Sequence, residues 1–276
     1  MGGPLNYREV SPGPALARYV QCYWFLSSAE RETGEVQPIL PDGRMELVLN
    51  LGNHFRRVIE SGWERQPPVM VVGQMGGPVV VEPTGAVDIV GVRFHPWGAG
   101  AFIDAPMAQF RDQLSSLDDV SGKLYRLIKD NQSELLERRS IASLERVLQS
   151  ALRVQRNSND LAERAARLIV SSRGATSVSA IASEVGLTGR QLERRFVAAV
   201  GIGPKRLCRL LRFQEALRVA QEQSRPNWAE IAARSGYFDQ AHLIRDFSEF
   251  SGASPAALQL SETSLTALMV AESNGR

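Results

Sequence analysis

Two arginines, Arg194 and Arg245, occupy equivalent places in a pattern that occurs twice in the C-terminal part of the chain. At about 100° per residue, neither arginine shares a helix face with the apolar residues around it, so packing does not require either one. An outward guanidinium offers a rigid fork of donors that matches the O6 and N7 acceptors of guanine in the major groove of DNA. The recurrence therefore indicates base readout as the chemistry to consider first.

Other polar residues accompany the two arginines on the outward faces. We predict base contacts from the outward residues of both copies: Arg190, Gln191 and Arg194, and Gln240, Ala241, His242 and Arg245. Contacts to phosphate position a protein on a duplex without reading its sequence, and we predict them from basic residues on the flank and beyond: Arg195, Lys205, Arg206 and Arg209. For His242 a capping or packing role fits the pattern equally well, and Gln240 could contact phosphate instead of a base edge.

The repeated pattern is that of a helix-turn-helix: an apolar helix face, a glycine turn and a second apolar face. The two copies correspond with one residue of slippage after the turn, and the matched pairs are Ile181/Ile231, Ala182/Ala232, Gly186/Gly236, Leu192/Leu243, Arg194/Arg245, Phe196/Phe247, Gly201/Gly252, Pro204/Pro255 and Leu207/Leu258. We expect Leu187 to fill the corner of the first turn, and Tyr237 or Phe238 to fill the second. A helix that begins at Pro204 would hold the two units about 34 Å apart, in successive major grooves of one duplex.

The basic charge is concentrated in the same region. The whole chain has a net charge of +2, yet the stretch 188–212 holds seven Lys and Arg residues against a single acid, Glu193. This excess favours a polyanionic partner for the C-terminal half, although a solvated basic face would give the same count.

The N-terminal part has a different character. Residues 1–105 are rich in β-branched and aromatic residues between glycine and proline turns, which predicts short strands in a small barrel or sandwich. Helical spacing follows over 98–153, and its stripe 141–152 is expected to pack on the barrel, with a second subunit as the alternative. The predicted fold class is α+β, a cupin-like β-rich domain with helices followed by an all-α domain. We expect domains at 1–155 and 160–260, a polar linker at 154–160 and a frayed tail at 261–276.

A barrel of this kind can hold one small ligand or be filled by its own side chains. The polar residues that could face such a ligand are Asp42, Arg44, Glu46, Arg93 and His95, although the PDG segment at 41–43 is also typical of a plain turn. Three tryptophans either line an aromatic pocket or belong to the core: Trp24, Trp63 and Trp97.

Composition limits the classes of function. Hydrophobic content of 43% and charged content of 22% are typical of a globular protein, and no apolar stretch is long enough to span a bilayer. We find no secretory signal and expect a cytoplasmic protein in which Cys22 and Cys208 are reduced thiols. His54 and His95 are too few for a metal cluster, and phosphate-loop, catalytic-serine and zinc-protease motifs do not occur. We therefore predict no metal, no cofactor and no enzymatic activity.

The segment GYFDQAHLIRDFSEFSGASPAAL at 236–258 resembles the signature of the AraC/XylS family of bacterial transcription regulators, and the paired helix-turn-helix resembles that family's DNA-binding domain. The resemblance implies a sequence-specific regulator that recruits or blocks RNA polymerase. It places base contacts on Arg190, Glu193 and Arg194, and on Gln240, Ala241, His242 and Arg245. The N-terminal half resembles a sensor domain of unknown ligand, marked by PDGRMELVLNLG and GVRFHPWGAGAFI.

The chain departs from the family in one respect. Basic residues usually follow the position of Phe247, where this chain has Ser248 and Glu249. Because an acid at that place repels phosphate, we expect the first reader to supply more of the affinity than the second.

Three functions stay open at this point. The first is a regulator of a bacterial promoter, activator or repressor, that a small-molecule effector or a partner controls and that acts as a monomer or homodimer. The second is a repair-type enzyme on DNA with the same reader, which would need an activated cysteine that Cys22, in an apolar run, does not suggest. The third is an architectural DNA binder without a sensor. The operator, the regulated genes and the effector are not encoded in these patterns.

Overall fold

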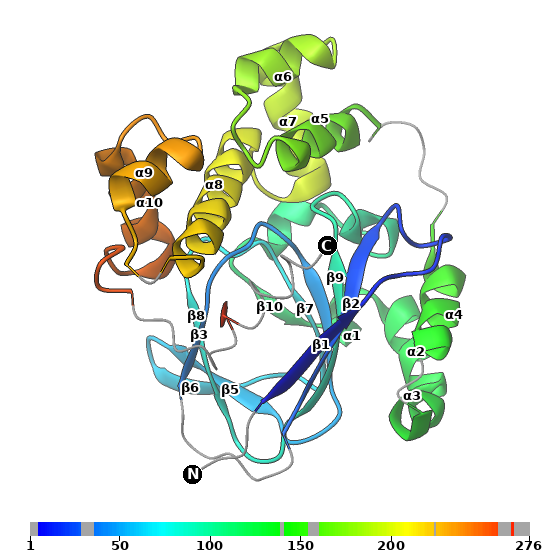
Figure 1. Cartoon of the computed structure of the whole chain (residues 1–276). Helices are drawn as coiled ribbons and strands as arrows, with labels where there is room; N and C mark the ends of the chain where they lie inside the picture. The colour runs from blue at the N-terminus through cyan, green and yellow to red at the C-terminus, as the bar shows by residue number, and fades with distance from the viewer. Residues whose placement is uncertain are drawn as a thin grey trace.

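The computed structural model describes residues 5–28, 36–138, 141–153, 160–223, 225–258 and 266–267. A β-rich N-terminal half is followed by an all-α C-terminal half, which confirms the predicted α+β class (Figure 1). The predicted linker 154–160 falls outside the described residues except for Asp160.

Two antiparallel sheets form the β-rich half of the described chain. The larger sheet has the order β1 (Asn6–Val10), β2 (Val20–Ser27), β9 (Asp88–Phe94), β4 (Glu46–Asn50), β7 (Val69–Val72) and β10 (Leu114–Ser116). The smaller sheet has the order β3 (Gln37–Ile39), β8 (Val79–Pro83), β5 (Phe55–Ile59) and β6 (Gly62–Arg65). Apolar side chains of both sheets pack toward each other, so the sheets enclose a common lumen.

Side chains alternate across the larger sheet. In β9, Ile89 and Arg93 face the lumen, whereas Val90 and Val92 pack toward the neighbouring helices. Gly91 lies opposite Trp24 in the register of β2 and β9, and a Cβ at Gly91 would stand 1.9 Å from the Trp24 ring. The absence of a side chain at this place lets the indole lie against β9 inside the lumen.

The stretch 98–153 is less helical than predicted. It contains two 3₁₀ turns, η1 (Ala99–Ala101) and η2 (Met107–Phe110), strand β10, and the helices α1 (Leu117–Val120), α2 (Gly122–Asp130), α3 (Gln132–Arg138) and α4 (Ile141–Ala151). The helical interpretation was wrong at Leu114, because that residue pairs with Val72 in a strand too short to show its own periodicity. The stripe on α4 does pack on the barrel, through Leu144, Val147 and Leu148.

The C-terminal half is built of six helices among the residues described. They are α5 (Asp160–Ser171), α6 (Val178–Glu184), α7 (Gly189–Val200), α8 (Pro204–Gln221), α9 (Trp228–Arg234) and α10 (Gln240–Ser251). The predicted connecting helix is α8, and it begins at Pro204, where a residue without an N–H fits the first turn. Phe196, Phe213 and Phe247 are fully buried in the core that these helices share.

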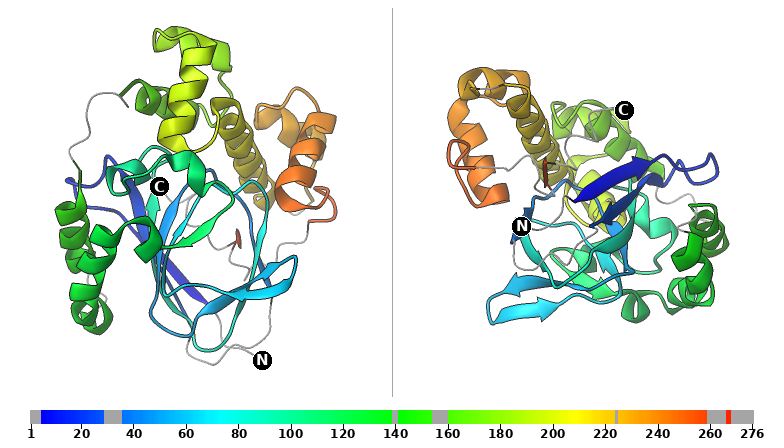
Figure 2. Two further views of the ribbon diagram at one scale, coloured as in Figure 1. Left: turned by 180° about the vertical axis from the view of Figure 1, so that it is seen from behind. Right: turned by 60° about the horizontal axis from the view of Figure 1, so that its bottom comes forward.

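The two halves are in contact. Helices α5, α7 and α8 lie over one end of the barrel, with α6 beyond α7, while α2 to α4 lie beside the barrel (Figures 1 and 2). Leu40 and Trp97 belong to the same apolar cluster as the helical core, and the Gln214 amide donates to the Pro41 carbonyl over 2.7 Å. At a second point, Arg18 pairs with Glu163 of α5 over 2.9 Å. The position of the reader helices is therefore tied to the barrel.

The described part of the predicted tail also contacts the barrel. Thr266 donates to the Pro38 carbonyl over 2.7 Å and accepts from the Leu40 amide over 3.2 Å. Thr266 and Ala267 are buried. The other residues of the tail lie outside the described chain. No helix among the described residues is long and apolar enough to cross a membrane.

Candidate nucleic-acid interface

The first helix-turn-helix unit consists of α6, a glycine turn and α7. Gly186 has a φ of +69°, a conformation that favours glycine, and the Leu187 amide then donates to the Ala182 carbonyl over 2.9 Å. Leu187 packs against the helical core, as predicted for the corner residue. Helix α7 starts at the N-cap Thr188, whose hydroxyl accepts from the Gln191 amide, so the start of this recognition helix is fixed by the sequence.

Recognition helix α7 presents its predicted contact residues to solvent. Arg190, Glu193 and Arg194 are exposed, and Arg195 on the flank is half-buried. With the described residues, neither Arg190 nor Arg194 forms an ion pair. The guanidinium groups of Arg190 and Arg194 are therefore available to donate to an external acceptor.

Gln191 has a second role in this helix. Its side-chain oxygen accepts from the Thr188 amide over 3.0 Å, which completes a capping box. The base contact predicted for Gln191 would have to come from the amide nitrogen, since the oxygen already serves the cap.

The second unit repeats this geometry with α9, a glycine turn and α10. Gly236 has a φ of +74°, and the Tyr237 amide donates to the Ala232 carbonyl over 3.0 Å. The buried Tyr237 fills the corner, and Phe238, the other residue that we considered for this role, points into solvent. Asp239 is the N-cap of α10 and accepts from the His242 amide over 2.7 Å.

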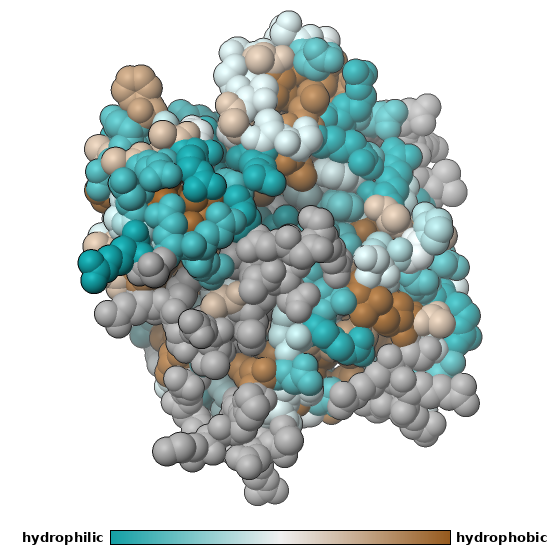
Figure 3. Space-filling model, in the orientation of Figure 1, coloured by the Kyte–Doolittle hydropathy of each residue, from teal (hydrophilic) through white to brown (hydrophobic). Residues whose placement is uncertain are grey.

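Helix α10 also presents predicted contact residues outward. Gln240, Ala241 and Arg245 are exposed, while His242 is half-buried with its ring edge-on to Tyr237 at 5.1 Å. His242 thus has a packing role that is compatible with a base contact. On the face shown in Figure 3, hydrophilic residues cover most of the α9–α10 unit, as expected of a surface that is exposed to solvent or to DNA.

Ion pairs between α8 and α10 were not foreseen from the sequence. Arg209 donates to the buried Asp246 over 2.7 Å, and Arg206 donates to Glu249 over 3.1 Å. Glu249 also pairs with Arg209. Burial alone would raise the pKa of Glu249, but its hydrogen bonds with Arg209 and the nearby arginine charges outweigh that effect and lower it. Glu249, which we expected to repel phosphate, is therefore neutralised by the connecting helix.

Two of the residues predicted to contact phosphate are thus engaged within the protein. Arg206 and Arg209 are both half-buried, and Arg206 also donates to the Gly76 carbonyl of the barrel over 3.0 Å. Lys205 is exposed. A signal for the pairing existed in the repeat, because the place of Arg195 in the first copy is taken by Asp246 in the second.

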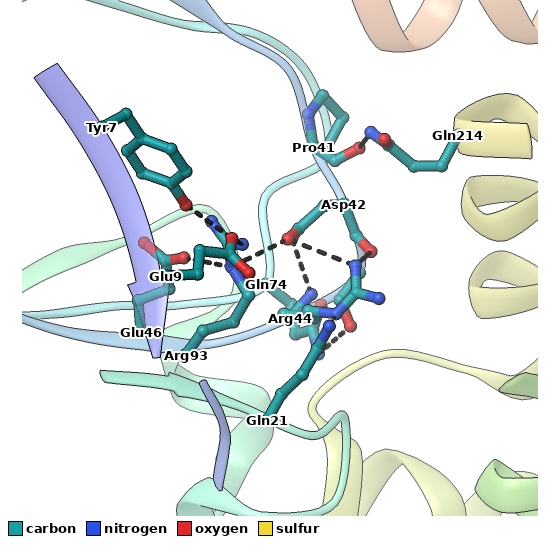
Figure 4. A network of polar contacts seen from close by, with 11 residues as sticks. Tyr7, Glu9, Gln21, Pro41, Asp42, Arg44, Glu46, Gln74, Arg93 and Gln214 are labelled. Atoms are coloured by element: carbon teal, nitrogen blue, oxygen red, sulfur yellow. Dashed lines mark hydrogen bonds and ion pairs between the residues drawn. The ribbon is translucent and has the colours of Figure 1, made fainter. Parts of the chain in front are cut away.

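A second site lies in the lumen of the barrel, where four of the five polar residues singled out in the sequence meet. Arg93 donates to Glu9 and to Glu46, each over 2.7 Å, and its Nε lies 3.7 Å from Asp42 (Figure 4). Arg44 lies beside Asp42 and donates to its carbonyl over 3.1 Å. Burial raises the pKa of Glu46. The group forms a buried charge network at one end of the lumen.

His95 does not join this network. It stacks on Trp97 with the ring centroids 4.8 Å apart, and burial lowers its pKa to about 4. Of the three tryptophans, Trp24 is in the lumen, Trp97 packs with the helical core, and Trp63 lies on the exposed strand β6. Among the described residues, no three His, Cys, Asp or Glu side chains are placed to hold a metal ion.

A cavity of about 390 Å³ adjoins the charge network. Its walls are mostly apolar side chains of both sheets, among them Trp24, Val48, Phe55, Met70, Val79, Val81 and Ile89. One side is closed by the connecting helix α8, through Leu211, Gln214, Glu215 and Arg218. A molecule in this cavity would touch the helix that joins the two readers.

Family models match both halves of the chain. Residues 8–116 match a domain of unknown function (DUF6597), and residues 181–261 match a helix-turn-helix domain, a range that runs from within α6 to beyond α10. The C-terminal part of the chain is therefore a helix-turn-helix domain of the AraC type. A domain of this type supports a DNA-binding transcription regulator.

Other comparisons give distant similarity. No curated protein sequence matches the regulator. ToxT from Vibrio cholerae O395 is similar with a TM-score of 0.44 and 10% identity over 84% of this chain and 95% of that one. The AraC-like activator CuxR is similar with a TM-score of 0.28 and 14% identity over 80% and 87% of the two chains. A cupin domain of an XRE-family regulator from Enterobacter cloacae is similar with a TM-score of 0.25 and 12% identity over 33% of this chain and 95% of that one.

The thiols of the regulator are not activated. Cys22 and Cys208 are both buried, and burial raises the pKa of Cys22 to about 12 and that of Cys208 to about 11. A thiol with such a pKa is protonated at neutral pH, so neither cysteine has the thiolate character that an alkyl-transfer nucleophile needs.

Proposed function

We propose that this regulator binds a bacterial promoter sequence-specifically, with α7 and α10 in successive major grooves of one duplex. The observation that carries the proposal is the equivalence of the two readers. Each recognition helix follows a positive-φ glycine, starts at a side-chain N-cap and presents an exposed arginine at the same repeated place, Arg194 or Arg245. One chain thus carries two readers, and the spacing expected between their sites is about one helical turn of DNA.

A selection experiment tests this function. The full chain is used to enrich binding sites from random duplex DNA, and we expect a recovered site with two different half-sites, centred about 10 base pairs apart. The variant Arg194→Ala should relax the sequence at one half-site and Arg245→Ala at the other. Arg164→Ala, which removes an exposed arginine of α5, is the matched control. A chain that enriches no sequence, and binds only with a steep salt dependence, would be an architectural binder instead.

We also infer that a small molecule in the barrel controls the readers. The cavity offers apolar walls at one end and the Asp42, Glu46 and Arg93 network at the other, which suits an amphipathic effector with an apolar body and a polar end. The same cavity is bounded by α8, whose ends hold the two readers. A bound effector would therefore act on their relative orientation, and through it on recruitment or exclusion of RNA polymerase.

Thermal unfolding with a panel of amphipathic metabolites tests the effector site, because a ligand that binds only the folded chain raises its Tm. A compound that raises the Tm of the parent chain should lose this effect in Val79→Phe, which places a larger side chain in the cavity wall. Val58→Phe, at an exposed position of β5, is the matched control. An equal shift in parent chain and Val79→Phe would place the ligand elsewhere.

A further inference from the structure

The two copies of the reader differ by one residue, and the structure locates the difference. In the first unit the glycine is followed by the corner residue Leu187 and then by the N-cap Thr188. In the second unit the corner residue Tyr237 and the N-cap Asp239 are separated by one residue. The slippage in the repeat is therefore Phe238.

Phe238 is held between two fixed neighbours. The amide of Tyr237 makes the same turn bond as that of Leu187, and the buried Tyr237 ring has the Arg212 guanidinium 5.5 Å from its centroid. On the other side, Asp239 caps α10. The inserted residue thus stands at the entrance of the recognition helix in a defined place, and it does not belong to a loose loop.

The side chain of Phe238 contributes little to the fold. It is 93% exposed, whereas the other exposed large apolar residues of the described chain are 38–46% exposed. Single apolar residues on a surface are common. Phe238 differs from them because it is almost wholly in solvent and lies next to the N-cap of the helix that presents Gln240 and Arg245.

We infer that Phe238 packs against the C5 methyl group of a thymine at the edge of the second reader's site. The inference rests on the proposed function, in which the N-terminal end of α10 enters the major groove. Phenylalanine has no donor for a phosphate or a base acceptor. The apolar group that base pairs present in the major groove is the thymine methyl, and an aromatic side chain is a suitable contact for it. The extra residue would make the second reader prefer thymine at a place where the first has no counterpart.

The test uses the full chain and the site recovered by selection. Each thymine of the second half-site is replaced singly by uracil, which removes only the methyl group, and Kd is measured at one salt concentration. For the parent chain we expect one thymine whose replacement weakens binding about fourfold, the factor that one buried methyl group contributes. For Phe238→Ala we expect binding of the unmodified site to weaken by at least that factor, with no further loss on uracil at that thymine.

Matched variants make the outcome decisive. Val58→Ala shortens an exposed apolar residue on β5 and should bind like the parent chain, and Phe238→Leu should keep the preference for thymine. Phe238→Ala with parental affinity would overturn the inference. A weaker Phe238→Ala that keeps the full thymine-to-uracil ratio would also overturn it, because the methyl contact would then come from Ala241 or another residue. Failure of the selection itself would instead remove the proposed function.

Discussion

Arg209 donates from Nη2 to Oδ1 of Asp246 over 2.7 Å, and this pair connects α8 to the second recognition helix, α10. The Asp246 side chain is 1% exposed and that of Arg209 is 23% exposed, so water screens the interaction only in part. Burial opposes the charge on Arg209, but the hydrogen bond with Asp246 outweighs it and the pKa of the guanidinium is raised. The pair holds α10 against α8. It uses Arg209, for which the sequence predicted a contact to DNA phosphate.

We predict that Asp246→Ala destabilises the protein by about 2 kcal/mol, because it leaves a partly buried guanidinium without its best acceptor. The free energy of unfolding in urea measures the effect. Glu249→Ala is the control: this carboxylate is more exposed and should cost less than about 1 kcal/mol. Equal losses in the two variants would show that burial of Asp246 does not matter.

Arg194→Ala and Arg245→Ala should each weaken binding of the selected site about 10- to 100-fold, as expected of one lost bidentate base contact. We expect the larger loss for Arg194, since the exposed Arg190 lies one turn before it on α7, whereas the acids Asp246 and Glu249 follow Arg245 on α10. Kd measured on specific and random duplexes separates base contact from charge. A larger loss for Arg245 would contradict the stronger first reader.

Acid should weaken the contact between barrel and α5. Burial alone would raise the pKa of Glu163, but its hydrogen bonds with Arg18 and Arg167 outweigh burial and hold that pKa below the usual value. At pH values near and below about 4.3, the carboxyl group of Glu163 binds more protons in the unfolded chain than in the folded one. The stability from Glu163 is thus complete above that pH range and is lost as the pH falls through the folded pKa. Unfolding free energy should therefore fall less steeply with acid in Glu163→Gln than in the parent chain.

Gly91→Ala should destabilise the barrel by about 1–3 kcal/mol, because its methyl group would overlap the Trp24 ring in a packed lumen. Gly122→Ala is the contrasting variant. It adds the same methyl group at the first residue of α2, where no atom lies within 4 Å, and should leave the Tm unchanged or slightly higher. Similar behaviour of both variants would mean that the indole can move aside.

The helical half was predictable from local signals. Apolar spacing, the turn glycines Gly186 and Gly236 and the start at Pro204 all act within a few residues, and the structure has these features where the repeat placed them. The corner of the second turn stayed ambiguous, since Tyr237 and Phe238 are both aromatic and only packing of the whole domain decides which is buried.

The barrel was predictable as a class but not in its interior. Arg93 is distant in sequence from Asp42 and Glu46, and the register of β4 and β9 rather than sequence spacing brings it beside them. Glu9, which completes the network, gave no local signal of burial, and Asp246 was marked only by taking the place of Arg195 in the repeat. His95 was grouped with the network by its residue type, and the start of the following turn instead places it on Trp97.

The contact of Thr266 with Pro38 and Leu40 links late and early parts of the polypeptide. Because Thr266 also contributes to the wall of the cavity, the ribosome must pass codon 266 before that wall can be completed. Any response to a metabolite would therefore be acquired only after both readers have been synthesised.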